Sequence, residues 1–325
     1  MGRESGGFEE RINKKLKNKR PMYCKHLIRV LLFILPFFVA GGCTKEDTSD
    51  CRTAVRLQLS YTHNKEGRDL FKEVATCGDI LLYNGDGTLL ERRAMTAREY
   101  ETATLQLMVP LEKASYTVVF WANLLTENYV LDSEATMQSM RMSLQHEQGQ
   151  VSGVLPDLLH GVSSFATDGQ RTPIEQTLSM RNLTNQVNVI LEGAMSGTRA
   201  AGTAYSMQLT GSNGLYGWAA DNFPGESLNY VPIYTPNIAG YDKALCGTFH
   251  TLHLWPGSDL RLMIFNGSSV LYDEPLVDLL MQSPDINTED DLWRYSDYYL
   301  RFDSNMMLTA IKVLEWHDID TEGGL

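Results

Sequence analysis

After residue 50 the chain is dominated by an alternation of apolar and polar residues. In AVRLQLSY (54–61), every second residue from Val55 onward is apolar, which is the period-two pattern of a half-buried β-strand. The same alternation recurs in TATLQLMVP (102–110) and in NQVNVILEG (185–193). We therefore expect a protein built mainly from strands.

Turn residues separate these strands. In DILLYNGDGTLLERR (79–93), the NGDG turn lies between two apolar runs, which predicts a hairpin. SYTVVFWANL (115–124) is rich in β-branched and aromatic residues that suit a buried strand. Further strand candidates are YSMQLTG (205–211), TFHTLHLW (248–255), DLRLMIFN (259–266), YYLRFD (298–303) and AIKVLEW (310–316).

Helical patterns are few. EGRDLFKEVA (66–75) and DEPLVDLLMQS (273–283) each suggest one short helix. Because strands do not alternate with helices, the order of elements predicts antiparallel β-sandwiches. The length of 325 residues suits two domains of moderate size. We place the boundary in the polar segment FATDGQRTPIEQ, which gives sandwiches at residues 51–176 and 177–325.

The first 42 residues have the composition of a signal peptide with a basic leader. The uninterrupted apolar run from Val30 to Ala40 has eleven residues, whereas a membrane-spanning helix needs about 20. Lys25 and Arg29 supply the basic flank of such a peptide. The basic stretch before Met22 is unusually long, so we expect Met22 to be the true start.

The stretch VAGGCTKED (39–47) resembles a bacterial lipoprotein box, although Ala40 stands where leucine is commonest. The resemblance implies that Cys43 carries a thioether-linked diacylglycerol and an N-acyl chain such as palmitate. Several acyl chains hold a protein durably on a membrane, so residues 43–50 are predicted to be a lipidated linker. Lys45, Glu46 and Asp47 resemble the surface-export signal of lipoproteins in certain Gram-negative anaerobes. The alternative is a plain secretory signal with an incidental cysteine.

The net charge and the number of cysteines limit the possible partners and the possible disulfides. The net charge is −12, which argues against nucleic acid as a partner, because phosphate-binding proteins usually carry a basic excess. Three cysteines remain after residue 50, so at most one internal disulfide can form. A Cys51–Cys77 disulfide and buried free thiols, including Cys246, both remain open.

No catalytic motif stands out. The chain lacks Gly-x-Ser-x-Gly, His-Glu-x-x-His, a phosphate loop and a dinucleotide-binding turn. His250 and His253 fall on opposite faces of a strand, so they make a poor metal site. We predict no enzyme activity, no catalytic residues, no metal and no cofactor beyond the lipid. One group of aromatic residues suits either sugar stacking or a sandwich core: Tyr216, Trp218, Trp293, Tyr295, Tyr298 and Tyr299.

Several short motifs, taken in order, resemble the FimB-type minor fimbrial lipoproteins, the anchor subunits of type V pili in Gram-negative anaerobes. After the lipoprotein cysteine they are CRTAVRLQLSYTHN, DILLYNGDGTLL, YTVVFWANL, DLLHG (157–161), LSMRNLTNQVNVIL with Arg181, and IKVLEW. The resemblance implies two tandem transthyretin-like sandwiches. It also implies a lipidated subunit at the base of a fimbria, joined to the first shaft subunit.

Shaft subunits of such pili join by strand exchange, because an open sheet edge invites an added strand. Our candidate for the partner strand is the segment from Leu308 to Trp316, in which the apolar residues are Leu308, Ile311, Val313, Leu314 and Trp316. The alternative is an ordinary last strand of the second sandwich.

The sequence therefore predicts a non-enzymatic lipoprotein on the outer surface of the outer membrane that anchors or assembles a fimbria. Its predicted partners are a fimbrial shaft subunit and the membrane. The alternative is a surface glycan-binding lipoprotein or a fimbrial tip adhesin.

Overall fold

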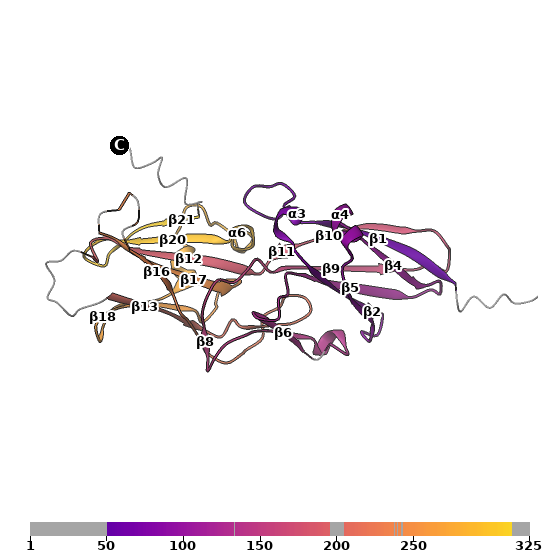
Figure 1. Cartoon of the computed structure of the whole chain (residues 1–325), viewed down its shortest axis with the longest axis horizontal. Coiled ribbons are helices and arrows are strands. Elements are labelled where there is room, and N and C mark those ends of the chain that lie inside the picture. Colours follow the sequence, from indigo (N-terminus) through magenta and orange to yellow (C-terminus); the bar gives the residue numbers. More distant parts are fainter. Residues whose placement is uncertain are drawn as a thin grey trace, which may run out of the picture. The chain divides into compact units, whose positions relative to one another are not determined.

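The fold is built from strands, as the alternation predicts. Within the described residues the strands form five sheets, and the helices are few and short (Figure 1). The predicted all-β fold class is confirmed. The described residues from Cys51 onward belong to one compact unit. The computed structural model describes the following residues: 51–132, 134–195, 205–236, 238, 240–241 and 243–313.

The first two sheets enclose a hydrophobic core. One has the strand order β10-β1-β4 and the other the order β11-β9-β5-β2-β3. Alternate residues of β1, among them Leu57 and Leu59, are fully buried and pack against Val118 and Phe120 of β5. The strands are β1 (Arg52–Ser60), β2 (Gly78–Asn84), β3 (Leu89–Ala94), β4 (Thr104–Pro110), β5 (Ser115–Ala122), β9 (Leu159–Ala166), β10 (Ile174–Ser179) and β11 (Arg181–Asn182).

Two further sheets have the orders β16-β17-β12-β20-β21 and β19-β18-β13-β15-β8. Most neighbouring strands are antiparallel, and the parallel pairs among the described strands are β1–β10, β12–β20 and β15–β8. The strands are β8 (Gln150–Val151), β12 (Thr184–Leu191), β13 (Tyr205–Gly211), β15 (Leu228–Tyr230), β16 (Ile233–Pro236), β17 (Leu245–Leu252), β18 (Arg261–Asn266), β19 (Ser269–Pro275), β20 (Asp297–Phe302) and β21 (Leu308–Lys312).

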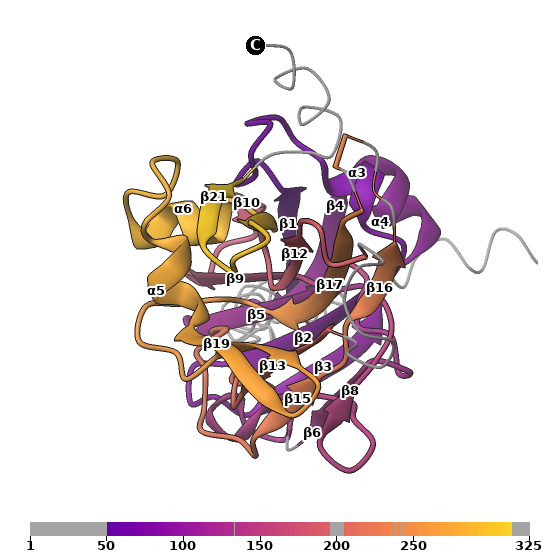
Figure 2. The same ribbon diagram turned by 90° about the vertical axis from the view of Figure 1, so that its left-hand side faces the viewer.

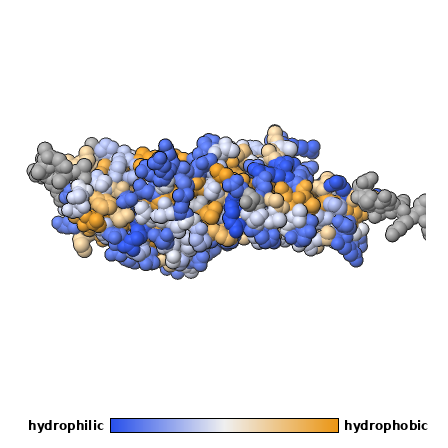
Figure 3. All heavy atoms as spheres, turned by 90° about the horizontal axis from the view of Figure 1, so that it is seen from below, coloured by the Kyte–Doolittle hydropathy of each residue, from blue (hydrophilic) through white to orange (hydrophobic). Residues whose placement is uncertain are grey.

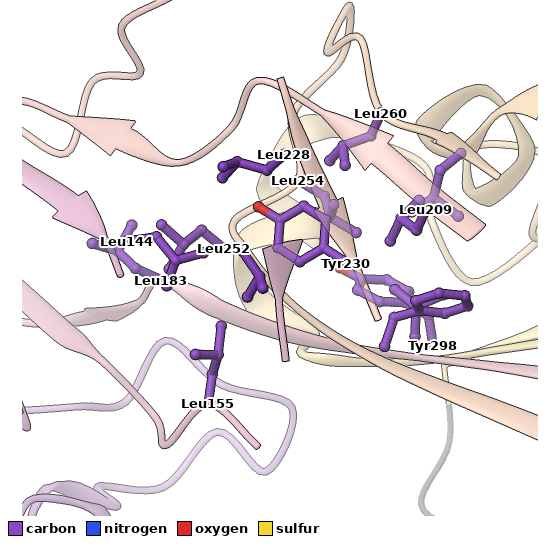
Figure 4. Close-up of a cluster of buried hydrophobic side chains, with 14 of the residues drawn as sticks. Leu144, Leu155, Leu183, Leu209, Leu228, Tyr230, Leu252, Leu254, Leu260 and Tyr298 are labelled. Carbon is purple, nitrogen blue, oxygen red and sulfur yellow. The ribbon is translucent and has the colours of Figure 1, made fainter. Parts of the chain in front are cut away.

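Strands from the first half of the chain pair with strands from the second half. The small fifth sheet joins β6 (Tyr129–Asp132) and β7 (Arg141–Leu144) to β14 (Leu215–Tyr216). Figure 4 shows Leu144 and Leu155 among core residues of the second half, such as Leu209 and Tyr230. The two halves are therefore interlocked through shared sheets and a shared core.

The predicted boundary between residues 176 and 177 falls inside β10. This strand pairs with β1 over Val55–Ser60, so it belongs to the first pair of sheets. The chain enters the second pair only where β12 begins, at Thr184. The segment looks like a linker in the sequence because β10 is an edge strand, and Glu175, Gln176 and Thr177 are exposed. The division into two domains stays a prediction.

Of the four α-helices among the described residues, two fall in the predicted segments and two were not predicted. The unpredicted helices, α4 and α6, each begin with a capping box, formed by Thr96 with Glu99 and by Thr288 with Asp291. This sequence signal was available, since Ser or Thr three residues before an acid is typical of a helix start. The helices are α3 (Phe71–Val74), α4 (Ala97–Thr102), the 3-10 helix η1 (Met137–Ser139), α5 (Leu276–Leu280) and α6 (Glu289–Arg294).

Among the described residues, no helix combines the length and the apolar character that crossing a bilayer requires. The three cysteines after residue 50 are free thiols, and Cys246 is buried. Of the two alternatives that the sequence left open, the structure therefore has free thiols.

Candidate functional site: the C-terminal edge strand

The predicted lipidation and export residues lie outside the described part of the chain. Cys43, Lys45, Glu46 and Asp47 all precede residue 51. Their assignments stay predictions. The described chain begins at Cys51, whose carbonyl accepts a hydrogen bond from the N–H of Leu111. This bond continues the β1–β4 ladder, so the first described residues are held against β4.

The predicted partner strand forms the edge of a sheet in its own chain. β21 pairs antiparallel with β20, and Ile311 lies opposite Leu300. In Figure 2, α6 lies beside β21. Val313, directly after the strand, is only 5% exposed and belongs to the larger hydrophobic core. Leu308 and Ile311 are half-buried and pack against that core.

The outer side of β21 has no further strand among the described residues. The hydroxyl of Ser283 donates a hydrogen bond to the carbonyl of Ile311 at 3.4 Å, which shows that this carbonyl points away from β20. Because the Ser283 hydroxyl occupies this carbonyl, a strand of another chain that paired with the outer edge of β21 would have to displace it. Leu314 and Trp316 lie outside the described residues, so the strand's role toward a partner stays a prediction.

Of the two histidines in TFHTLHLW, His250 lies in β17 and His253 follows that strand. The ring of His253 stacks on Trp293, with 3.4 Å between the ring centroids. Burial lowers the pKa of His253 to about 3, and the charge of Arg181 adds to this effect. Among the described residues, no group of three or more His, Cys, Asp or Glu side chains is arranged to hold a metal ion.

The aromatic residues proposed as a sugar-stacking group belong to the core. Tyr216, Tyr298 and Tyr299 are buried. The rings of Trp218, Trp293 and Tyr295 are partly buried and pack against the larger core cluster. Of the two interpretations that the sequence left open, the structure favours the sandwich core.

His160 and Arg181 have specific contacts that sequence reasoning did not identify. The Nε2 atom of His160 is hydrogen-bonded to the carbonyl of Trp218 at 2.9 Å, and its ring lies 4.3 Å from that of Trp121. Burial lowers the pKa of His160 to about 4. The guanidinium of Arg181 lies 5.0 Å from the ring of Trp293. Residues of the DLLHG motif and of β11 therefore join the two groups of sheets.

The exposed apolar residues are scattered. The face seen in Figure 3 shows small apolar patches among hydrophilic residues. Three of the exposed apolar residues are close together in the sequence. Val231, Ile233 and Tyr234 lie in or just before the edge strand β16. The others are Leu90, Met108, Val154, Met195, Val270, Leu271 and Met307.

Comparison with known proteins gives the family. The family model of the fimbrillin-A associated anchor proteins Mfa1 and Mfa2 matches residues 48–321. The chain belongs to this family. The resemblance of the sequence motifs to those of fimbrial anchor subunits is confirmed. A search of curated proteins finds no match.

Solved structures of similar fold include the fimbrial anchor protein Mfa2 from Porphyromonas gingivalis. It is 20% identical, has a TM-score of 0.64, and the match covers 82% of this chain and 98% of that chain. A candidate adhesin from Bacteroides ovatus is 22% identical with a TM-score of 0.67, over 82% and 94% of the two chains. A candidate polysaccharide-binding protein from Bacteroides thetaiotaomicron is 17% identical with a TM-score of 0.67, over 82% and 99%. At these identities the likeness shows the fold.

The family places the chain among fimbria-associated proteins of the cell surface. The family is described as one of fimbrillin-A associated anchor proteins, not as a family of enzymes. The sequence and the comparisons thus agree on the class of protein.

Proposed function

We propose that this chain is a non-enzymatic, lipid-anchored protein of the outer membrane that holds or assembles a fimbria on the cell surface. The observation that carries the proposal is the match of the anchor-protein family over residues 48–321. The cysteine at 43, with Gly41 and Gly42 before it and acidic residues after it, supplies the attachment point. In this proposal the chain needs no cofactor besides the diacylglycerol and N-acyl chains on Cys43.

The shaft subunit is the proposed partner, and the segment from Leu308 to Trp316 is the proposed contact. In the described part of this segment, β21 uses one edge to pair with β20. On its other edge, the carbonyl of Ile311 accepts a hydrogen bond from the Ser283 hydroxyl. In this proposal the added strand displaces the Ser283 hydroxyl; backbone groups of an edge strand then give affinity for the added strand, and the side chains give specificity.

Lipid attachment is tested by the Cys43→Ala variant expressed in the native organism. We expect it to lose radiolabelled palmitate and to leave the outer-membrane fraction. Cys24→Ala is the matched control, because Cys24 lies in the predicted signal peptide and should change neither result. A Cys43→Ala protein that stays lipidated and in the outer membrane contradicts the proposal.

Surface export is tested separately by replacing Lys45, Glu46 and Asp47 together with alanine. We expect this variant to keep its lipid and its outer-membrane location but to become resistant to protease added to intact cells. Unchanged protease sensitivity would remove the export role from these three residues.

The shaft contact is tested by deleting residues 307–325 and counting the fibres that remain on cells. We expect fibres to detach into the medium. Because the deletion also removes Val313 from the core, a second variant is needed. Thr309→Lys places a charge on an exposed edge position, which discourages strand pairing without disturbing the core. Folded variants that still hold fibres on cells would refute the strand contact.

A further inference from the structure

A hollow lies at the end of the first pair of sheets where the described chain begins. Its volume is about 400 Å³, which is within the usual range of small-ligand sites. In Figure 1 this end is at the right, where β1 starts. Among the residues that line the hollow are Asn84, Asp86, Leu90, Pro110, Glu112 and Tyr116.

The strand registers bring these residues together. Asn84, the last residue of β2, lies opposite Tyr116 of β5, and Pro110 ends β4. Gly85 lets the turn after β2 lie against β5, because a Cβ atom there would come within 3.3 Å of the carbonyl oxygen of Ser115. The hollow is therefore bounded by the turn after β2, the turn after β4 and the start of β5.

Tyr116 directs its hydroxyl into this hollow. The residue is only 2% exposed, and its ring stacks on Phe165 in the core of the first two sheets, with 5.7 Å between the ring centroids. No other described residue is hydrogen-bonded to the hydroxyl, and the oxygen is not enclosed by the protein. Burial raises the pKa of Tyr116, and the charge of Glu112 adds to this effect, so the hydroxyl stays protonated. A buried side chain with an unpaired, accessible polar tip suits a ligand that bonds to it.

Two carboxylates share the hollow with this hydroxyl, and neither forms an ion pair with another described residue. Hydrogen bonds from Thr88 lower the pKa of Asp86, so Asp86 stays ionised. Glu112 lies in the turn after β4 and is exposed. Leu90, which is 48% exposed, and Pro110 add an apolar wall. Negative charge beside a hydroxyl and an apolar wall fits an ammonium group on a short carbon chain.

The place of the hollow in the fold points to the membrane as the source of such a group. Arg52 begins β1 opposite Pro110, so the chain enters the fold at this same end. Cys51 follows Cys43 by eight residues, and eight residues span at most about 28 Å. With lipid on Cys43, this end of the fold stays within about that distance of the membrane surface.

We propose that the hollow binds the phosphoethanolamine headgroup of a membrane lipid. The ammonium group donates hydrogen bonds to the carboxylates of Asp86 and Glu112. The phosphate accepts the hydroxyl hydrogen of Tyr116 and pairs with Arg52, which is exposed and close enough for its charge to act on that hydroxyl. The inference rests on the proposed lipid anchor, and it adds a second membrane contact that orients the first pair of sheets toward the bilayer.

A lysine side chain of a partner protein carries the same ammonium group and is the competing occupant. It brings no phosphate, so it would leave the Tyr116 hydroxyl and Arg52 without an anionic partner. The hollow also belongs to other sheets than β21, the strand proposed to contact the shaft subunit. Both observations favour the lipid headgroup.

The test uses the purified mature chain in a non-ionic detergent and three soluble probes: glycerophosphoethanolamine, glycerophosphocholine and acetyl-lysine amide. Binding is measured by titration with ligand-observed NMR. We expect glycerophosphoethanolamine to bind with a dissociation constant in the millimolar range. Glycerophosphocholine should bind about tenfold more weakly, because its trimethylated nitrogen has no N–H to donate. Glu112→Gln and Tyr116→Phe should each weaken the binding of glycerophosphoethanolamine about tenfold.

Glu127→Gln is the matched control, because Glu127 is an exposed carboxylate that does not line the hollow. It should leave the affinity unchanged. Tyr116→Phe keeps the ring on Phe165, so its melting temperature should stay close to that of the wild type. The proposal is overturned if glycerophosphoethanolamine does not bind, if Glu112→Gln and Tyr116→Phe bind it as well as the wild type, or if acetyl-lysine amide binds more tightly. These measurements do not depend on the lipid on Cys43, so failure here leaves the anchoring proposal standing.

Discussion

Arg93 and Glu99 together occupy the free backbone edge of β4. The Oε1 atom of Glu99 accepts the N–H of Gln106 at 2.9 Å, and Nη2 of Arg93 donates to the Gln106 carbonyl at 3.0 Å. The two side chains also pair with each other at 2.7 and 2.8 Å. Both backbone groups that a neighbouring strand would use are therefore satisfied from within the chain, which protects this edge against unwanted pairing.

Glu99→Gln should show how much the contacts of the Glu99 carboxylate contribute to the free energy of unfolding. Burial raises the pKa of the Glu99 carboxyl, but hydrogen bonds from Arg93, Gln106 and Thr96 outweigh burial and lower the pKa to about 2. We expect the variant to lose about 2 kcal/mol of unfolding free energy at pH 7, measured by denaturant titration. Glu91→Gln, which removes an exposed partner of Arg93, should cost less than about 1 kcal/mol.

The stability difference between wild type and Glu99→Gln should depend on pH. Because the folded pKa lies below the unfolded value near 4.5, the charge of Glu99 stabilises the fold above that pH. This contribution is lost as the pH falls toward 2. The stability difference between wild type and Glu99→Gln should therefore shrink across that window, and a difference independent of pH would contradict the assignment.

His253→Phe should make the fold less sensitive to acid. Both ring nitrogens of His253 are buried without a partner, and burial lowers the pKa to about 3. As the pH falls below about 6.5, the unfolded chain binds a proton that the folded chain does not, so stability declines until about pH 3. The phenyl ring keeps the stacking on Trp293 but cannot titrate. Unfolding titrations at pH 7 and pH 4.5 should show a smaller decline for the variant, and equal declines would refute the prediction.

Gly161→Ala should destabilise the first pair of sheets. A Cβ atom at this position of β9 would meet the side chain of Leu178 and approach the carbonyl oxygen of Ser179 to 2.9 Å. That oxygen belongs to the backbone of β10 and cannot move without disturbing its pairing with β1. We expect a loss of about 1–3 kcal/mol. Gly225→Ala is the control, because its nearest atoms lie at 3.5 Å; similar melting temperatures for the two variants would contradict the prediction.

A fragment of residues 51–182 should not fold to a native state by itself. It would contain β7 and β8 without their partners β14 and β15, and it would expose Met142 and Leu144, which are buried in the whole chain. We expect poor dispersion in its amide NMR spectrum, and recovery of dispersion when a fragment of residues 183–325 is added. A well-dispersed spectrum of the first fragment alone would instead support two independent domains.

Much of the strand content could be predicted because alternation is a local property. The burial of Leu57 and Leu59 on one face of β1 follows directly from the pattern of the sequence. The polar strand β10 could not be recognised this way, because exposed edge residues such as Glu175 and Thr177 look like a linker. The capping boxes at Thr96 and Thr288 are local sequence signals, and they mark the starts of the two α-helices that the apolar pattern does not predict.

The candidate site was predictable only in part. The two-residue spacing of Ile311 and Val313 indicated a strand, and the motif order indicated the family. The pairing of Ile311 with Leu300, and the contact of Ser283 with the outer edge, depend on residues brought together by packing.

The sequence alone determined that the chain forms strands and that its motifs are those of fimbrial anchor proteins, because period-two patterns and short motifs are written in consecutive residues. Tertiary structure alone decided which strands are neighbours, that the two halves interlock through β7–β14 and β8–β15, and which backbone edges remain open. Those outcomes follow from hydrogen bonds and buried contacts between residues far apart in the chain, whose partners no local pattern specifies.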